Sequence, residues 1–387
     1  MNYYIISGEA SGDLHGSNLI KQLHLLDPSA NIRCWGGDLM EQAGANLVKH
    51  YRELAFMGFA EVIKNLPAIL QNIKFCKQDI LAFRPDVIVL IDYPGFNLRI
   101  AEWAKKRGFR IVYYISPQVW AWKENRVKKM KKCIDKMLCI LPFEKDYYKN
   151  KWNWEVEYVG HPLVEVIEEK QSGVRSRESG VIGNSKLLTP DTRLLNPNSH
   201  LIALLPGSRK QEISKKLPIM LEVAKSFPEY QFVVAEAPGL DNAFYAPFLL
   251  DYQNVSTVRN QTYDLLMNAS AALVTSGTAT LETALFGVPE IVCYKGSAIS
   301  YQIAKRLVKI KYISLVNLIM DKLVVTELIQ YQLTSENLVK ELSALLNNAD
   351  RKAILEKDYF DLKAILSAGG HASAKAAKSI VEYIAPH

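Results

Sequence analysis

Residues 201–213 read LIALLPGSRKQEI, and residues 271–282 read AALVTSGTATLE. In each stretch an apolar strand runs into a glycine, Gly207 or Gly277, and a helix is expected to follow. A glycine lets the chain turn tightly there, and the helix N-terminus offers free N–H groups to an anion. An ordinary tight turn explains either stretch alone. The two together favour a site for a diphosphate-bearing ligand.

The side chains beside the two glycines fit such a ligand. Arg209 carries a guanidinium suited to phosphate, and Glu282 lies where a carboxylate can accept bonds from ribose hydroxyls. A capping-box role for Glu282 is the alternative. Neither turn is a GxxxxGK[ST] loop, and neither carries a full GxGxxG. The candidate nucleotide-binding residues in these turns are Gly207, Ser208, Arg209, Gly277, Thr278, Thr280 and Glu282.

Short apolar runs alternate with helical stretches on both sides of these turns. Runs such as VIVLI and RIVYYI are apolar throughout, as expected for parallel strands covered on both faces. The predicted strands are residues 3–7, 32–35, 87–91, 111–115, 137–141, 157–159, 201–205, 231–236, 255–258, 271–275 and 290–294. The pattern predicts an α/β protein of two Rossmann-like, doubly wound parallel-sheet domains facing a cleft.

A polar stretch separates the two series of strands. We expect an N-terminal domain over residues 1–170, a linker or loop over 171–200, and a C-terminal domain over 201–365. Residues 366–387 are expected to include a final helix that packs back on the N-terminal domain.

Two features indicate that the N-terminal domain contains a second functional site. The first strand ends in GEASGDLHG, residues 8–16, and His15 is expected in the first turn of the following helix. Asp92 ends a buried strand in IDYPGFN, where burial can raise its pKa from about 3.9 and make it a general base. Packing or capping is the alternative for His15, and an N-cap role is the alternative for Asp92.

The bulk composition narrows the function classes. The chain has 387 residues, a net charge of +7 and five scattered cysteines without a CxxC pair. The cysteine pattern argues against a disulfide framework or a zinc site and fits a reducing compartment, and the positive net charge fits an anionic partner. No signal peptide and no apolar run of about 20 residues is found, so we expect a cytoplasmic protein.

Apolar, aromatic and basic segments indicate peripheral contact with a membrane. A core helix is the alternative for the apolar segment 56–73, loop packing for the tryptophans, and a solvated helix face for the basic run 123–136. The candidate acceptor-binding and membrane residues are Met57, Phe59, Val62, Ile63, Leu66, Trp120, Trp122, Lys128, Lys129 and Lys132.

The order of the motifs resembles one family over nearly the whole chain. GEASGDLHG, GGDLMEQAG, MGFAEV, IDYPGFN, SPQVWAW, YVGHPL, LPGSRKQEI and TSGTATLETAL follow one another as in lipid-A-disaccharide synthases. That family is similar to other inverting glycosyltransferases of the glycosyltransferase-B fold. The resemblance implies transfer of 2,3-diacylglucosamine from UDP-2,3-diacylglucosamine to 2,3-diacylglucosamine 1-phosphate, with no metal, no cofactor and no nucleic acid partner. It also implies that the protein binds peripherally to the inner-membrane surface. Whether the protein forms a homodimer stays open.

The resemblance also assigns residues. Asp92 matches the family's base, Arg209 and Glu282 match nucleotide-sugar contacts, and Asn317 in SLVNLIM matches an asparagine near the donor. Glu9 and His15 match the N-terminal loop and complete the candidate catalytic set with Asp92. The chain departs from the family at Gly95, where many members carry a second acidic residue, and at Thr326, where members usually have proline.

Two other functions fit part of the sequence. A UDP-sugar 2-epimerase of the same fold explains the glycine turns but has no use for the apolar and basic segments. A non-catalytic binder of anionic lipid explains the basic run but leaves the turns at Gly207 and Gly277 without a purpose.

Overall fold

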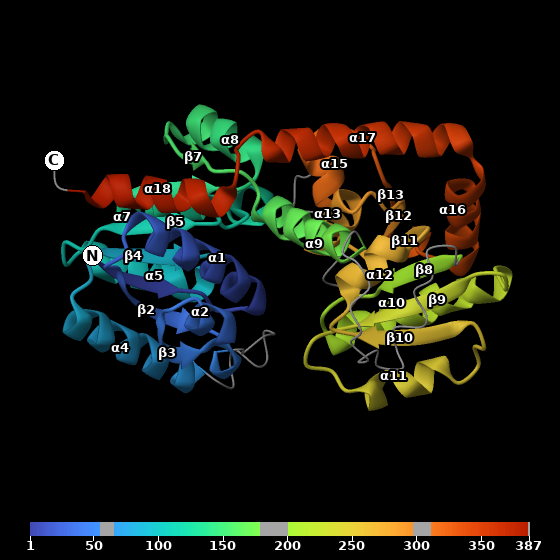
Figure 1. Ribbon diagram of the computed structural model, residues 1–387, viewed down its shortest axis with the longest axis horizontal. Helices are drawn as coiled ribbons and strands as arrows, with labels where there is room; N and C mark the ends of the chain where they lie inside the picture. Colours follow the sequence, from blue (N-terminus) through green and yellow to red (C-terminus); the bar gives the residue numbers. More distant parts are fainter. Residues whose placement is uncertain (55–65, 179–199, 297–310, 386–387) are drawn as a thin grey trace. The chain divides into compact units, whose positions relative to one another are not determined.

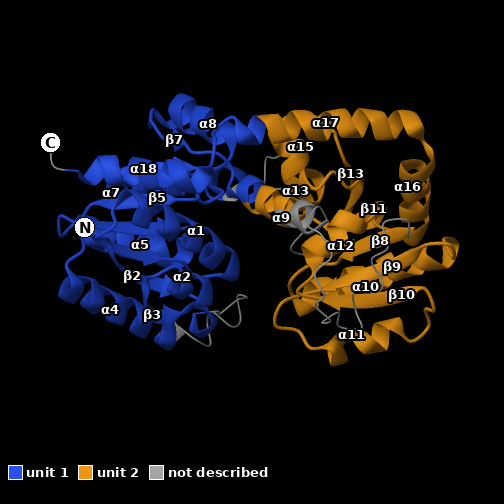
Figure 2. Ribbon diagram, viewed as in Figure 1, with its two compact units in different colours: residues 1–165, 365–387 blue, residues 166–364 orange. Residues whose placement is uncertain are grey.

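The computed structural model describes residues 1–54, 66–178, 200–296 and 311–385. For Leu66, Trp122 and residues 173–178 it describes the backbone but not the side chains. The chain divides into two compact units (Figure 2). Unit 1 comprises Met1–Glu165 and Ile365–His387, and unit 2 comprises Val166–Ala364. The expected division at residues 170 and 365 therefore differs by a few residues from the observed one.

Unit 1 is built on a seven-stranded sheet in the order β3-β2-β1-β4-β5-β6-β7, and every pairing in it is parallel. The strands are β1 (Asn2–Ile6), β2 (Asn31–Gly36), β3 (Asn46–His50), β4 (Val87–Ile91), β5 (Ile111–Tyr114), β6 (Lys136–Cys139) and β7 (Glu157–Tyr158). The helices are α1 (Ala10–Leu26), α2 (Asp38–Gln42), α4 (Leu66–Phe83), α5 (Pro94–Lys105), α6 (Val119–Trp122), α7 (Val127–Cys133), α8 (Pro142–Trp152) and α18 (Ala372–Ile384).

Alternate residues of the central strands pack into two separate hydrophobic cores, one on each face of the sheet. Tyr4, Ile88 and Leu90 pack in one core with α4, α5 and α7. Tyr3 and Val89 pack in the other with α1 and α18. Successive side chains of a strand point to opposite faces, so a strand covered on both sides is apolar throughout. The final helix therefore completes the core of unit 1, on the face where α1 lies (Figure 1).

Unit 2 repeats the plan with a six-stranded parallel sheet in the order β10-β9-β8-β11-β12-β13. Its strands are β8 (Leu201–Leu205), β9 (Gln231–Glu236), β10 (Val255–Arg259), β11 (Ala271–Thr275), β12 (Glu290–Tyr294) and β13 (Thr326–Ile329). Its helices are α10 (Lys210–Glu222), α11 (Asn242–Leu249), α12 (Thr262–Asn268), α13 (Thr278–Leu285), α15 (Leu315–Met320) and α16 (Ser335–Asn347). Two helices, α9 (Pro162–Glu178) and α17 (Ala349–Ser367), each have residues in both units.

One expected boundary needs correction, and two strands were not expected. The expected linker 171–200 begins within α9, because that helix continues to Glu178. The edge strands β3 and β13 were not predicted, because each is short and mostly half-buried and lacks the continuous apolar run of a central strand. The two-sheet α/β architecture itself is confirmed.

A backbone contact between Gly160 and Gly369 yields a first prediction. A Cβ atom at Gly369 would lie 2.4 Å from the Cα of Gly160, and backbone cannot move aside as a side-chain tip can. Gly369→Ala should therefore lower the free energy of unfolding by about 1–3 kcal/mol in urea titrations. Gly95→Ala is the matched control, because a Cβ there meets nothing within 4 Å. Equal free energies of unfolding for the two variants would contradict a close contact between Gly160 and Gly369.

Candidate active site

A cavity of about 370 Å³ opens in unit 2 at the carboxyl ends of β8, β9 and β11. Cavities of about 300–1,000 Å³ are typical of small-molecule sites, and this edge of an open parallel sheet is where ligands of α/β proteins bind. Its lining residues are Leu205, Gly207, Ser208, Arg209, Glu212, Ala235, Glu236, Ala237, Pro238, Thr262, Thr275, Ser276, Gly277, Thr278, Ala279 and Glu282. The structure thus brings the two glycine turns of the sequence together in one cavity.

Both glycines have a backbone conformation that other residues rarely adopt. The φ angle is +125° at Gly207 and +142° at Gly277. A Cβ at Gly207 would also lie 2.9 Å from Oε2 of Glu212. The helices α10 and α13 begin directly after these turns, so their first N–H groups lie at the cavity. Both turns therefore have the backbone geometry that the sequence predicts, and anion binding at them stays a prediction.

Two cations and one carboxylate lie beside the first turn. Arg209 is exposed over 60% of its side chain, and its Nη1 lies 3.3 Å from Oε1 of Glu212. Lys216 is only 3% exposed; its Nζ lies 3.8 Å from Oε2 of Glu212 and donates to Oγ1 of Thr275. Burial lowers the pKa of Lys216, and Glu212 opposes that shift. A diphosphate in the cavity would therefore meet the exposed guanidinium of Arg209, with the buried ammonium group of Lys216 close to the turn.

Lys216 was not singled out by the sequence. Helical periodicity could have pointed to this lysine, because it lies on the side of α10 where Ile213, Leu217 and Met220 are buried. A lysine on that apolar face is unusual unless its charge has a partner or a purpose.

Glu282 faces the cavity from α13. Its Oε1 accepts a hydrogen bond of 2.9 Å from the hydroxyl of Tyr263, and burial raises its pKa. The capping-box alternative is wrong, since the N-cap of α13 is Gly277 and no side chain caps this helix. The second carboxylate oxygen is consistent with binding a sugar hydroxyl.

Two predicted ligand contacts lie away from the cavity. Thr280 is buried, and its hydroxyl donates to the carbonyl oxygen of Gly277. Asn317 is also buried, with Nδ2 donating to Val325 and Glu327 and Oδ1 accepting from Val324 and Val325. The structure therefore gives both residues an internal role, Thr280 at the turn and Asn317 at the start of β13.

Asp92 in unit 1 directly follows β4 in a constrained backbone. Asp92 and Tyr93 have φ angles of +42° and +48°, in the left-handed region that is sparsely populated by residues other than glycine. The amide of Asn97 holds this turn through bonds of 2.7 Å to the carbonyl oxygen of Asp92 and 3.1 Å to that of Ile91. The N-cap of α5 is Tyr93, without a side-chain bond. The N-cap alternative for Asp92 is therefore wrong.

The environment of Asp92 suits a base. Burial, and then the charge of Glu9, raises the pKa of its carboxyl to about 6. General bases work best with a pKa near the working pH. Glu9 stands at the N-cap position of α1, so two of the three predicted catalytic residues interact electrostatically at the carboxyl edge of the sheet.

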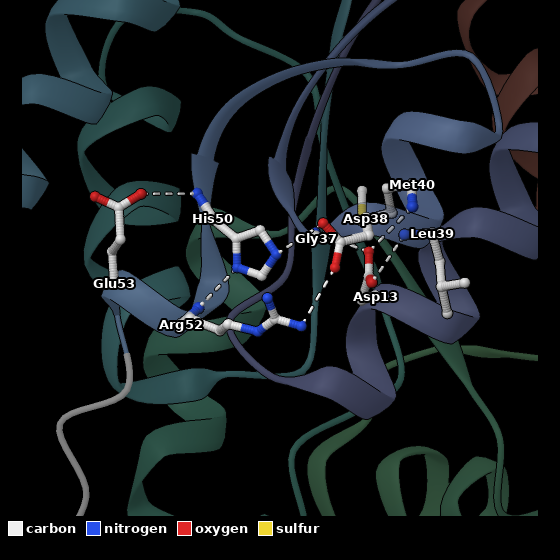
Figure 3. Close-up of polar contacts among 8 residues, drawn as sticks. All are labelled: Asp13, Gly37, Asp38, Leu39, Met40, His50, Arg52 and Glu53. Atoms are coloured by element: carbon white, nitrogen blue, oxygen red, sulfur yellow. Dashed lines mark hydrogen bonds and ion pairs between the residues drawn. The ribbon is translucent and has the colours of Figure 1, made fainter. Parts of the chain in front are cut away.

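The loop that carries Glu9 is fixed at several points. Asp13 accepts backbone N–H bonds of 2.8 Å from Gly37, 3.2 Å from Leu39 and 3.1 Å from Met40 (Figure 3). A Cβ at Gly8 would lie 2.4 Å from the ring of Tyr93. The glycine-rich motif thus allows the loop to lie against the Asp92 turn.

His15 lies in α1, and its Nδ1 is buried without a hydrogen-bond partner among the described residues. Burial lowers the pKa of His15 to about 4, so its imidazole is neutral at physiological pH. His161 of the YVGHPL motif is buried as well, and burial followed by His15 lowers its pKa to about 3. The sequence pointed to this motif but gave His161 no role.

The structure tests only part of the predicted membrane surface. Met57, Phe59, Val62 and Ile63 lie outside the described residues, and for Leu66 and Trp122 only the backbone is described. Trp120 donates a bond of 3.2 Å to Glu144 and packs edge-on against Phe143. That contact supports loop packing for Trp120.

The basic helix α7 turns its lysines outward. Val127, Met130 and Cys133 face the core, while Lys128, Lys129 and Lys132 are exposed. Lys129 forms an ion pair of 2.5 Å with Glu102. The helix α4 covers the same face of the sheet and exposes Leu70, Phe75 and Leu81.

The part of the chain that the structure describes contains no cluster of histidine, cysteine and carboxylate side chains suited to a metal ion. The five cysteines are buried and unpaired. Among the described helices, none has the length and hydropathy needed to cross a bilayer.

Comparison with known proteins identifies the family. Residues 3–384 match the lipid-A-disaccharide synthetase family. The lipid-A-disaccharide synthase of Syntrophus aciditrophicus is 37% identical over 382 residues, covering 97% of this chain and 96% of that protein. Lipid-A-disaccharide synthase 1 of Legionella pneumophila strain Lens is 37% identical over 370 residues, covering 94% and 92%.

Solved structures agree on the fold. The UDP-GlcNAc 2-epimerase of Neisseria meningitidis, solved with UDP-GlcNAc, aligns with a TM-score of 0.66 at 13% identity, covering 99% of each chain. The glycotransferase of kitacinnamycin aligns with a TM-score of 0.66 at 13% identity, covering 100% of this chain and 99% of that one. The chain has the glycosyltransferase-B type of architecture and belongs to the lipid-A-disaccharide synthase family of glycosyltransferases.

Proposed function

We propose that this enzyme transfers 2,3-diacylglucosamine from UDP-2,3-diacylglucosamine to the 6-hydroxyl of 2,3-diacylglucosamine 1-phosphate. The observation that carries the proposal is the pairing of the two glycine turns with Arg209 and Glu282 in one cavity of unit 2, with the buried Lys216 close to the first turn. This set matches a nucleoside diphosphate, with cations for the phosphates and a carboxylate for the ribose.

The chemistry follows from the groups present. The acceptor oxygen forms a bond to the anomeric carbon while the bond from that carbon to the diphosphate breaks. The hydroxyl proton passes to the carboxylate of Asp92, whose raised pKa makes it a better base. Negative charge builds on the departing UDP, where Arg209, Lys216 and the N-termini of α10 and α13 stabilise it. Attack from the side opposite the leaving group inverts the anomeric configuration.

The exposed surface of unit 1 supports work at the inner-membrane surface. The α4 side chains Leu70, Phe75 and Leu81 offer apolar contact, and the lysines of α7 offer positive charge. This combination of an apolar and a basic surface suits an anionic bilayer and acylated substrates. We therefore include peripheral membrane binding in the proposal.

Acceptor dependence of UDP release tests the reaction. The protein is incubated with UDP-2,3-diacylglucosamine, with and without 2,3-diacylglucosamine 1-phosphate, and UDP is quantified. Release that requires the acceptor is expected. Acceptor-independent release would instead indicate an epimerase or hydrolase of the same fold, and no release would indicate a binding protein.

Replacing the carboxylate of Asp92 separates its chemical role from its structural one. Asp92→Asn should reduce turnover by about 10²–10⁴-fold while UDP affinity, measured by calorimetry, stays unchanged. In the parent enzyme turnover should fall as the pH drops through about 6, because Asp92 is then protonated. Near-normal turnover of the variant would remove Asp92 from the role of base.

Stability provides the control for that variant. The pKa of Asp92 is higher in the folded state than in the unfolded state, so ionisation of this carboxyl destabilises the fold. The destabilisation begins at about pH 4, where the unfolded state ionises, and reaches its full size above about pH 6. Asp92→Asn should therefore gain stability, up to about 3 kcal/mol at pH 7.5 and less at pH 4.5. A variant that is more stable and less active cannot owe its lost activity to unfolding.

Vesicle sedimentation tests the membrane surface. Lys128→Ala with Lys132→Ala should weaken binding to vesicles containing anionic lipid by about tenfold or more, since each lysine near such a surface contributes about 1 kcal/mol. The control is Lys340→Ala with Lys357→Ala, which removes two exposed lysines of unit 2. Equal losses in both double variants would indicate a general charge effect rather than a surface on α7.

A further inference from the structure

Unit 2 contains a second cavity, of about 390 Å³, at the opposite edge of its sheet. It lies where β12 and β13 begin, with α17 along one side. Its lining residues are Glu290, Leu323, Val324, Val325, Thr326, Leu345, Asn348, Asp350, Arg351, Ile354, Leu355 and Asp358. None of these residues lines the nucleotide cavity. The five residues of β12 alone span about 16 Å, so the two cavities are separate sites.

The second cavity is bordered by a carboxyl group without a partner. Glu290 opens β12 and is 1% exposed, and neither of its oxygens has a hydrogen-bond partner among the described residues. Burial raises the pKa of this carboxyl well above its usual range. Tyr359 of α17 is buried as well, and its hydroxyl interacts with Glu290.

Such groups are rare in a folded protein. Most buried polar groups have a partner, and leaving one without costs about 1–3 kcal/mol. Here the unpartnered carboxyl of Glu290 borders a cavity. A ligand that binds the Glu290 carboxyl would remove this cost.

The remaining charged groups around the cavity define what that ligand is. Arg351 donates bonds of 2.8 Å to both Thr326 and Glu341, and Asp358 forms an ion pair of 2.5 Å with Lys322. These four charges neutralise one another in pairs. The carboxyl groups of Glu290 and Asp350 remain, and no cation lining the cavity is left to balance them. The cavity therefore favours a positive ligand.

The mouth of the cavity is apolar. Leu323 and Ile354 are 66% and 64% exposed, which is unusual for large aliphatic side chains, while Val325, Leu345 and Leu355 are buried behind them. A ligand with hydrocarbon next to its charge would cover this surface, and burial of each methylene contributes about 0.8 kcal/mol.

We propose that this cavity is a binding site for a small organic ammonium ion, a primary amine on a short hydrocarbon chain. The ammonium group pairs with the carboxylate of Glu290, and the hydrocarbon lies along Leu323 and Ile354. The oxygens of Glu290 are shielded from solvent in the free protein, so its side chain rotates toward the cavity as the ligand enters. The site lies away from the glycosyl-transfer machinery and does not depend on that activity.

Binding carries a proton signature. Burial raises the pKa of Glu290, whereas pairing with an ammonium ion favours its ionised form. Binding should therefore be accompanied by proton release from this carboxyl, and affinity should increase with pH. An alkylammonium ion itself stays charged below about pH 10.

Calorimetry with butylammonium chloride tests the site on the full-length protein. The expected result is saturable binding, at least tenfold weaker in Glu290→Gln and unchanged in Glu356→Gln, which alters an exposed carboxylate of α17. Butan-1-ol, with the same chain and no charge, should bind at least tenfold more weakly than butylammonium. Binding at pH 8.5 should be tighter than at pH 6.5, with proton release seen as a dependence on buffer ionisation enthalpy.

Two outcomes would overturn the proposal. Equal binding of butylammonium to the parent protein and Glu290→Gln would place the amine elsewhere. No binding to the parent protein at 20 mM, a concentration on the order of a Kd for weak fragments, would make Glu290 a neutral structural carboxyl. Urea unfolding of Glu290→Gln, together with its UDP affinity, shows that the variant is folded, and neither should fall.

Discussion

A parallel strand covered on both faces can present polar chemistry only at its ends. This constraint governs both units. All five residues of β4 are buried, as are those of β8 and β11, so nothing along these strands can bind a polar ligand. The chain becomes polar at the residue where each strand stops, and Asp92, Gly207 and Gly277 lie within two residues of those points. Each sheet thus gathers polar groups from different parts of its own unit at its carboxyl edge.

The same burial gives the groups at the edge their properties. Low polarity around Asp92 disfavours its charge and raises its pKa, and it keeps His15 neutral. Burial likewise lowers the pKa of Lys216, whereas the nearby Glu212 favours its charged form. The fold accepts these unfavourable charges and a left-handed backbone at Asp92 and Tyr93, a strain expected at functional sites rather than in a stable core.

The sequence predicts what depends on local pattern. Apolar runs locate the central strands, and a strand followed by glycine locates both turns of the nucleotide cavity. It misses the edge strands β3 and β13, whose half-buried residues lack such runs. It also misses features set by three-dimensional contacts. The hydrogen bonds of Asn317 to Val324, Val325 and Glu327 and the tyrosine partner of Glu282 depend on side chains that no spacing rule brings together.

The proposed roles of the two units in glycosyl transfer place different demands on their charged groups. Arg209 of unit 2, whose guanidinium carries five hydrogen-bond donors and no acceptor, is the group proposed to face the leaving diphosphate. Asp92, with a pKa of about 6, changes charge close to neutrality. Stabilising a leaving group requires fixed charge, whereas accepting a proton requires a group that can change its charge. In the proposed reaction, the ionisation of Asp92 in unit 1 should therefore contribute an acid limb to the pH dependence near pH 6.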